Sequence, residues 1–164
     1  MVSPNVGRQH DSPESRIKSL GIQLPAPPTP FGSYVEAVQT GNLLFLSGML
    51  PVVDHKAAYI GKLGRELDTK AGQNAARIAA LGAIASAKDF LGTIDRIKRV
   101  VRLGVFMVTV EDFGDHPGVA DGASDLFRDV FGVENMAVRS VIGAATLPLG
   151  VPVELEIIFE LIEQ

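Results

Sequence analysis

The sequence predicts an α/β (α+β) domain in which a single mixed β-sheet carries two helices packed on one face, in the order β-β-(β)-α-β-α-β-β. Apolar runs of strand length occur in pairs near both ends, and two longer segments with helical periodicity lie between them. The 164 residues are 46% hydrophobic, which is enough for one ordinary core without metal or disulfide support. Two helices cover only one face of such a sheet, so its other face needs a different partner.

Residues 1–29 are predicted to precede the domain proper, which would occupy residues 30–164. A flexible tail leads to Ser12-Pro13-Glu14, which combines a helix N-cap, a first-turn proline and a first-turn acid. A short helix is expected from there to Gly21. Four prolines then require an extended strap: Pro25, Pro27, Pro28 and Pro30.

Strands are predicted from apolar runs rich in β-branched and aromatic residues. The runs at 34–38 and 43–47 flank a turn-like Gln-Thr-Gly-Asn sequence and indicate a hairpin. The turn-rich segment 52–68 has room for one short strand. The remaining strands are expected at 97–110, 138–146 and 153–162.

Two helices are predicted, over residues 69–91 and 117–131. Asp68 or Thr69 caps the first, and Gly92 follows its end. The core side of this helix is made of small residues, which allow its axis to lie close to a sheet: Ala75, Ala76, Ala79, Ala80, Ala83 and Ala87.

Apolar side chains are also expected on the sheet face that the helices leave open: Val100, Phe106, Val108, Val110 and Ile158. Large exposed apolar patches normally mark an interface. We therefore expect a homo-oligomer in which the helix-free faces of the subunits meet.

Composition and charge exclude several functional classes. Fifteen Lys+Arg against nineteen Asp+Glu give a net charge of -4, which argues against affinity gained by neutralising nucleic-acid phosphates. The absence of cysteine excludes disulfides, thiol nucleophiles and cysteine-based zinc sites. No secretory signal or membrane-spanning run is visible, which favours a cytoplasmic protein.

Neither a metal nor an organic cofactor is expected. The three histidines, His10, His55 and His116, stand at no metal-ligand spacing, and no phosphate-binding glycine loop is present. A basic cluster is predicted to form a solvated or salt-bridged edge of the sheet: Arg96, Lys98, Arg99 and Arg102.

Arg139 is the most informative charged residue, because it interrupts an otherwise apolar strand. A guanidinium among groups destined for a core or an interface needs an anionic partner. Its fork matches a carboxylate, so the partner is either a structural acid or a ligand. Glu154, expected on the adjacent final strand, is the internal candidate.

Three blocks of this sequence resemble the RidA/YjgF family of reactive-intermediate (imine) deaminases, also called endoribonuclease L-PSP-like proteins. The most specific block joins Ala137-Val138-Arg139-Ser140-Val141-Ile142, then Leu147-Pro148, then Val153-Glu154-Leu155-Glu156. The segments 32–48 and 122–126 resemble the first hairpin and second helix of the family. The resemblance covers residues 30–162 and implies a chorismate-mutase-like sheet in a homotrimer with clefts between subunits.

The resemblance also implies residue roles. Arg139 corresponds to the arginine that grips the substrate carboxylate, and Glu154 to the acid that positions the attacking water. Tyr34 corresponds to a tyrosine lining the cleft, and Gly48 to a position whose backbone faces the ligand. Departures from common family residues leave the preferred substrate side chain open: Ala137 for proline, Val141 for cysteine and Met49 for glutamine.

The implied activity is that of a 2-iminobutanoate/2-iminopropanoate deaminase-like hydrolase acting on C–N bonds. Such an enzyme converts reactive 2-imino or enamine acids to 2-keto acids and ammonia without metal or cofactor. Two alternatives remain: an endoribonuclease, and a trimer that binds small carboxylates without catalysis. The acidic pI and the lack of a catalytic histidine beside Arg139 count against the ribonuclease.

Overall fold

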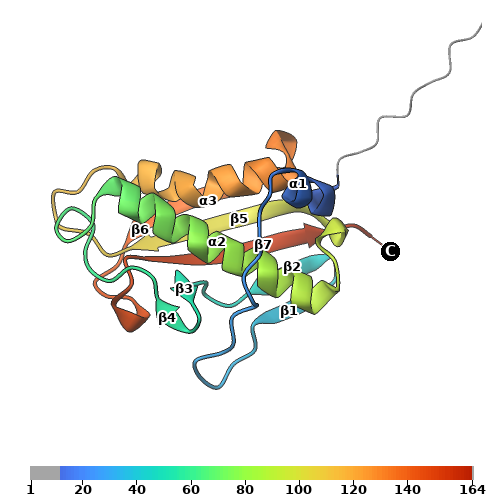
Figure 1. The fold of residues 1–164 in the computed structure, drawn as a ribbon, viewed down its shortest axis with the longest axis horizontal. Coiled ribbons are helices and arrows are strands. Elements are labelled where there is room, and N and C mark those ends of the chain that lie inside the picture. Colours follow the sequence, from blue (N-terminus) through green and yellow to red (C-terminus); the bar gives the residue numbers. More distant parts are fainter. Residues whose placement is uncertain (1–11, 164) are drawn as a thin grey trace, which may run out of the picture.

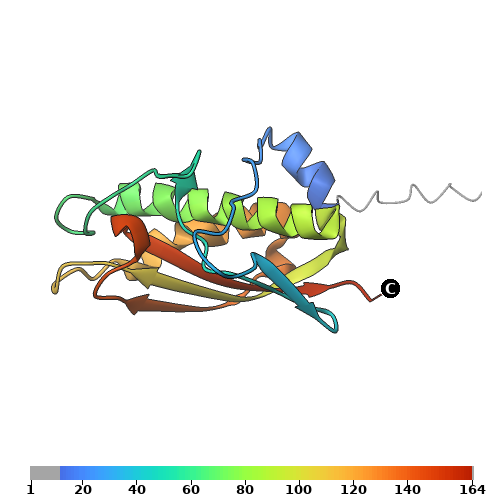
Figure 2. The same ribbon diagram turned by 90° about the horizontal axis from the view of Figure 1, so that it is seen from below.

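The computed structural model describes residues 12–163, and its main feature is a five-stranded mixed sheet with two long helices on one face (Figures 1 and 2). All neighbouring strands are antiparallel except for one parallel pair at one edge of the sheet. This architecture confirms the predicted fold class. In spatial order the strands are β1 (Ala37–Thr40), β2 (Leu43–Leu46), β7 (Val153–Leu161), β5 (Ile97–Met107) and β6 (Val138–Gly143).

The two long helices have the termini that their end signals predict. Helix α2 (Thr69–Leu91) is capped by Asp68, whose carboxylate accepts a hydrogen bond from the Ala71 amide at 2.7 Å. Gly92 ends it in the left-handed conformation, with φ of 80°. Helix α3 (His116–Phe131) begins after Asp115, whose side chain accepts from the Gly118 amide.

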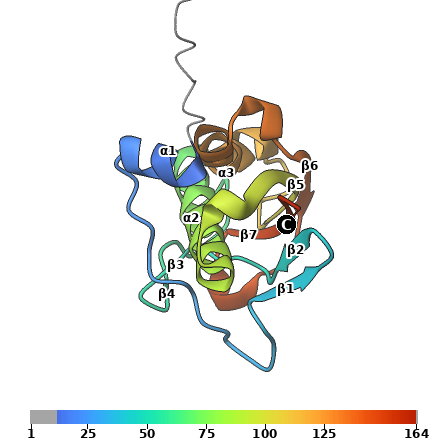
Figure 3. The same cartoon turned by 90° about the vertical axis from the view of Figure 1, so that its right-hand side faces the viewer.

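The N-terminal segment packs against the domain. The predicted short helix is present as α1 (Pro13–Ser19), which lies beside α2 and α3, and the strap then crosses the outside of α2 (Figures 1 and 3). Ile17 is buried in the core, and Glu14 accepts a hydrogen bond from Lys88 at 2.9 Å. The tail at residues 1–11, including His10, lies outside the described residues.

Close packing of α2 on α3 depends on small side chains. The six predicted core alanines of α2 are all fully buried. At Gly122 of α3, a Cβ atom would lie 2.0 Å from the backbone oxygen of Gln73 in α2, so only glycine fits there without moving the helices apart. This contact fixes the position of α3 and of every side chain that α3 presents to the sheet.

Four sequence expectations need correction. The first strand begins at Ala37, because Tyr34 and its neighbours form a loop. Val100 lies in the core, because irregularities in the β5–β7 register turn its side chain to the helix face. Val108 is also buried, beyond the end of β5. The segment 52–68 contains a two-stranded hairpin of its own, β3 (Val52–Val53) with β4 (Lys56–Ala57).

The helix-free face combines apolar side chains with ion pairs. Its exposed large apolar side chains come from β1, β2 and β6: Val38, Phe45, Val138 and Ile142. Phe106 and Ile158 lie on the same face, as predicted, and are partly exposed. The predicted basic cluster is salt-bridged at three of its four positions, because Lys98 and Arg99 pair with Glu160, and Arg102 pairs with Glu156. The three residues lie on β5, which is an interior strand of the sheet and not its edge.

Within residues 12–163, no helix combines the length and apolar character needed to cross a membrane.

We expect Gly122→Ala to destabilise the fold by about 1–3 kcal/mol, because the added methyl overlaps the α2 backbone. Gly82→Ala is the matched control in α2, since a Cβ there meets only Pro28 Cγ, at 4.0 Å. The free energy of unfolding of the control should rise by about 0.5–1 kcal/mol from helix propensity alone. Urea denaturation of both variants measures the difference; equal stabilities would contradict the packing account.

Candidate functional site

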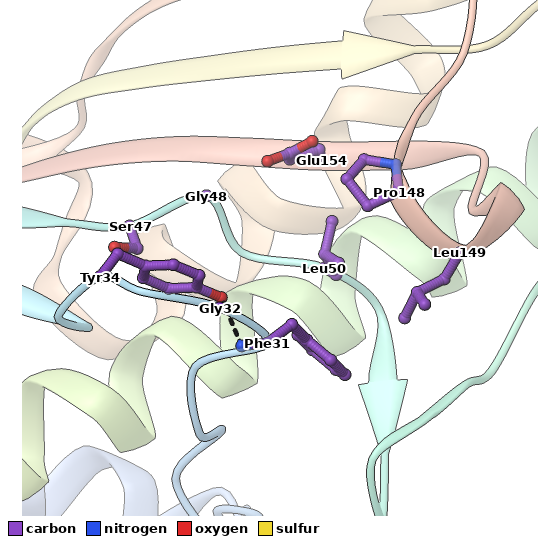
Figure 4. A pocket seen from close by; sticks show the side chains of 9 residues that line it. All are labelled: Phe31, Gly32, Tyr34, Ser47, Gly48, Leu50, Pro148, Leu149 and Glu154. Atoms are coloured by element: carbon purple, nitrogen blue, oxygen red, sulfur yellow. Dashed lines mark hydrogen bonds between the residues drawn. The ribbon is translucent and has the colours of Figure 1, made fainter.

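A cavity of about 360 Å³ opens beside the end of β2 and the start of β7 (Figure 4). Its walls come from three segments far apart in sequence: the loop before β1, the chain leaving β2, and the loop before β7. One carboxylate, that of Glu154, lines this cavity and is the group most suited to chemistry there. The lining residues are Phe31, Gly32, Tyr34, Ser47, Gly48, Leu50, Pro148, Leu149 and Glu154.

Glu154 approaches the backbone at Gly48 unusually closely. A Cβ atom at position 48 would lie 2.0 Å from Glu154 Oε1, so any side chain larger than hydrogen would displace the carboxylate. The two segments are fastened together one residue further on. The Met49 amide donates to the Leu155 carbonyl at 2.8 Å, and the Leu155 amide donates to the Met49 carbonyl at 2.9 Å.

The Glu154 carboxyl lies in a partly desolvated environment. Burial raises its pKa above the ordinary range of a glutamate. Among the described residues, no hydrogen bond or ion pair reaches the Glu154 carboxylate oxygens. Both oxygens can therefore accept a hydrogen bond from a ligand or a water molecule. A carboxylate with a raised pKa holds a proton more strongly than an ordinary glutamate, so it is a better proton acceptor.

Tyr34 reaches the cavity from a loop that is held against the end of β2. Its hydroxyl oxygen accepts a hydrogen bond from the Phe31 amide at 2.9 Å, as Figure 4 shows. The hydroxyl of Ser47 donates to the Val35 carbonyl at 2.6 Å, and its amide donates to Glu36. Because the Tyr34 oxygen acts as an acceptor, its own proton remains available for a ligand.

Arg139 lies on β6 and is held by helix α3. Its Nη1 donates to Asp121 Oδ1 at 2.7 Å and to Ser124 Oγ at 3.0 Å. Its side chain is 26% exposed. Within the part of the chain that the structure describes, Nε and Nη2 have no hydrogen-bond partner, so one edge of the guanidinium fork is free.

Glu154, the internal candidate partner of Arg139, does not contact it within one chain. Strand β5 lies between β6 and β7, so the two residues are not on adjacent strands. Arg139 is opposite the buried Leu103 and points to the helix face. Glu154 is opposite Phe106 and points to the helix-free face. The internal acid that Arg139 contacts is Asp121.

The cavity therefore unites three of the four expected site residues, Tyr34, Gly48 and Glu154, while Arg139 lies elsewhere in the same chain. The sequence reasoning missed Asp121 and Ser124 as partners of Arg139. Their spacing of three residues on a predicted helix was the available signal, because such residues share one face. It also missed the apolar walls formed by Phe31, Leu50 and Leu149.

The histidines of the described chain make ordinary contacts. His55 shares a hydrogen bond with Thr29, and the ring of His116 packs edge-on against Phe113. Across residues 12–163, no group of three or more His, Asp or Glu side chains is arranged to hold a metal ion.

Comparison with known proteins places this geometry in context. Residues 14–161 match the family model described as "YjgF/chorismate_mutase-like, putative endoribonuclease". Protein TCP17 of Trypanosoma cruzi is 41% identical over 90% of this chain and 92% of its own. A protein of Dermatophagoides farinae named 2-iminobutanoate/2-iminopropanoate deaminase is 29% identical, with coverage of 82% and 91%.

A solved structure agrees with the fold over nearly the whole chain. The protein Atu1372 of Agrobacterium tumefaciens is 36% identical, with a TM-score of 0.84 over 93% of this chain and 94% of its own. Together with the family match over residues 14–161, this similarity identifies the chain as a member of the YjgF/RidA family.

Proposed function

We propose that this protein hydrolyses 2-imino acids, or their enamine tautomers, to 2-keto acids and ammonia. The observation that carries the proposal is the Glu154 carboxylate, which is desolvated, unpaired among the described residues and placed against Gly48 in a largely apolar cavity. The similarity to the imine deaminase of Dermatophagoides farinae supports the same reaction. The oxidation state of the substrate does not change, so water is the only co-reactant required.

We propose further that each site is shared between two copies of the chain, in a homotrimer. Arg139 and Glu154 leave opposite faces of the sheet, so one small substrate reaches both only if they come from different subunits. Strand β6 is a sheet edge among the described strands, and its Val138 and Ile142 are 70% and 48% exposed. Exposed apolar edges of this kind are normally covered.

In the proposed mechanism, Arg139 of one copy binds the substrate carboxylate through the free edge of its guanidinium. Asp121 and Ser124 hold the other edge, which fixes the direction of the fork before substrate arrives. The carboxylate contact then places the imine carbon in the cavity of the neighbouring copy, beside Glu154 and Tyr34.

Glu154 accepts a proton from a water molecule as the water oxygen bonds to the imine carbon. The imine nitrogen takes up a proton from solvent, which gives a tetrahedral carbinolamine. Glu154 then returns its proton to the nitrogen, and the C–N bond breaks. Ammonia leaves while the hydroxyl proton passes to solvent and the C–O bond becomes the keto group. The apolar walls limit competing water, which strengthens these charge interactions.

The shared site can be tested by subunit complementation. We expect Arg139→Ala and Glu154→Gln each to remove nearly all acceleration of imine loss while the oligomer persists. When the two variants are co-expressed and co-assembled, about one quarter of the sites would combine a native Arg139 with a native Glu154. Imine generated in situ by an amino-acid oxidase or a threonine dehydratase provides the assay.

Recovery to about one quarter of wild-type activity would support a site between subunits. No recovery would contradict it, since a site within one chain cannot be repaired by mixing. A wild-type protein that binds 2-keto acids but leaves imine loss at the buffer rate would instead be a carboxylate-binding module. Cleavage of a defined RNA that disappears in Arg139→Ala would identify a ribonuclease.

The raised pKa of Glu154 predicts an unusual pH dependence. The base form is lost as pH falls through the folded-state pKa, so kcat/KM should decline at a higher pH than an ordinary glutamate, near 4.5, would allow. Initial rates, corrected for uncatalysed hydrolysis at each pH, measure this acid limb. Glu154→Gln should show a low, flat profile; an unchanged acid limb in that variant would show that another group is the base.

A further inference from the structure

A second cavity of about 340 Å³ lies directly beside the candidate site. It is enclosed between the proline-rich strap, the β3–β4 hairpin and the outer face of α2. Phe31 and Leu50 line both cavities, so these two side chains form the wall between them; Figure 4 shows both in one view with Glu154. The second cavity is thus a space into which a ligand bound beside Glu154 could extend.

The lining of the second cavity suits an apolar group. The strap contributes proline rings, and β3 contributes Val52 and Val53. Its polar members lie near the β3–β4 turn, where Thr29 and His55 hydrogen bond to each other at 3.3 Å. Among the described residues that line it, none is a lysine or arginine that would attract an anionic group.

A glycine in the middle of α2 helps to keep this cavity open. Gly82 lines it, and a Cβ atom there would meet only Pro28 Cγ, at the ordinary contact distance of 4.0 Å. Packing therefore does not require glycine at this position, and glycine is less favourable than alanine inside a helix. Because Gly82 has no side chain, the space between this part of α2 and the strap stays empty.

The wall between the cavities is not part of the packed core. Phe31 is 50% exposed and stands on the loop before β1. Such a ring changes rotamer at little cost, because few neighbours fix it. Rotation of Phe31 would remove its part of the wall and leave Leu50, the sheet and the helices in place.

We infer that the second cavity receives the side chain of the substrate, and that the protein acts on 2-imino acids with long apolar or aromatic side chains. Phe31 is the gate, and Gly82 sets the depth. This inference rests on the proposed function, since it takes Glu154 as the point at which the reacting carbon sits. A one-carbon side chain, as in 2-iminopropanoate, has no need of the second cavity and provides an internal reference.

Gly82→Leu tests the inference by filling the cavity, with Gly82→Ala as the matched control that removes the glycine but adds only one methyl. We expect Gly82→Leu to lower kcat/KM at least tenfold for the imines of phenylalanine and leucine, since lost apolar side-chain contacts change specificity by about 10–200-fold. The value for 2-iminopropanoate should change less than twofold. Equal losses for all three imines, or no loss for any, would overturn the inference.

A binding measurement separates this inference from the catalytic proposal. Calorimetry with pyruvate, phenylpyruvate and 4-methyl-2-oxopentanoate reports side-chain affinity without any hydrolysis. The wild-type protein should bind the two larger keto acids more tightly, and Gly82→Leu should remove that preference even if no imine is hydrolysed. Absence of keto-acid binding, or a preference that Gly82→Leu leaves intact, would overturn the subsite whatever the outcome of the imine assay.

Discussion

The pleat of the sheet imposes the constraint on which the proposed site depends. Strand β5 separates β6 from β7, and the register places Arg139 opposite Leu103 in the core but Glu154 opposite Phe106 on the other face. Because alternate residues of a strand leave opposite faces, no rotamer change in one chain brings these two side chains together. A substrate held by both must therefore lie between two copies, and the exposed apolar edge at β6 offers a surface for that contact.

The two charged groups are prepared in opposite ways. Arg139 is half satisfied within its own chain, since Asp121 and Ser124 occupy Nη1 and leave Nε and Nη2 free. Glu154 has no such partner among the described residues, and burial raises its pKa. An anchored cation suits the recognition of a carboxylate, whereas a desolvated carboxylate suits proton transfer. Gly48 keeps the Glu154 carboxylate in this position, because the Glu154 oxygen occupies the space that a side chain at position 48 would fill.

Local signals in the sequence predicted the elements well, while relations between distant strands escaped them. Asp68 and Gly92 mark the ends of α2 because capping depends on neighbouring residues alone. Tyr34 was predicted to lie in a strand, yet it lies in a loop. Hydrogen bonds that Ser47 donates hold this loop, and no local sequence pattern predicts them. Val100 was predicted on the helix-free face but lies in the core, because an irregularity in the β5–β7 register shifts the alternation of side chains. The partner of Arg139 was misassigned because strand order in space differs from strand order in sequence.

The most direct test of the shared site is a crystal structure of the protein with a bound 2-keto acid, the product class of the proposed reaction. The account predicts the ligand carboxylate on the free guanidinium edge of Arg139 from one copy, and the keto carbon beside Glu154 of the neighbouring copy. A keto acid bound with both residues from the same chain, or an interface in which protein groups occupy Nε and Nη2 of Arg139, would contradict it.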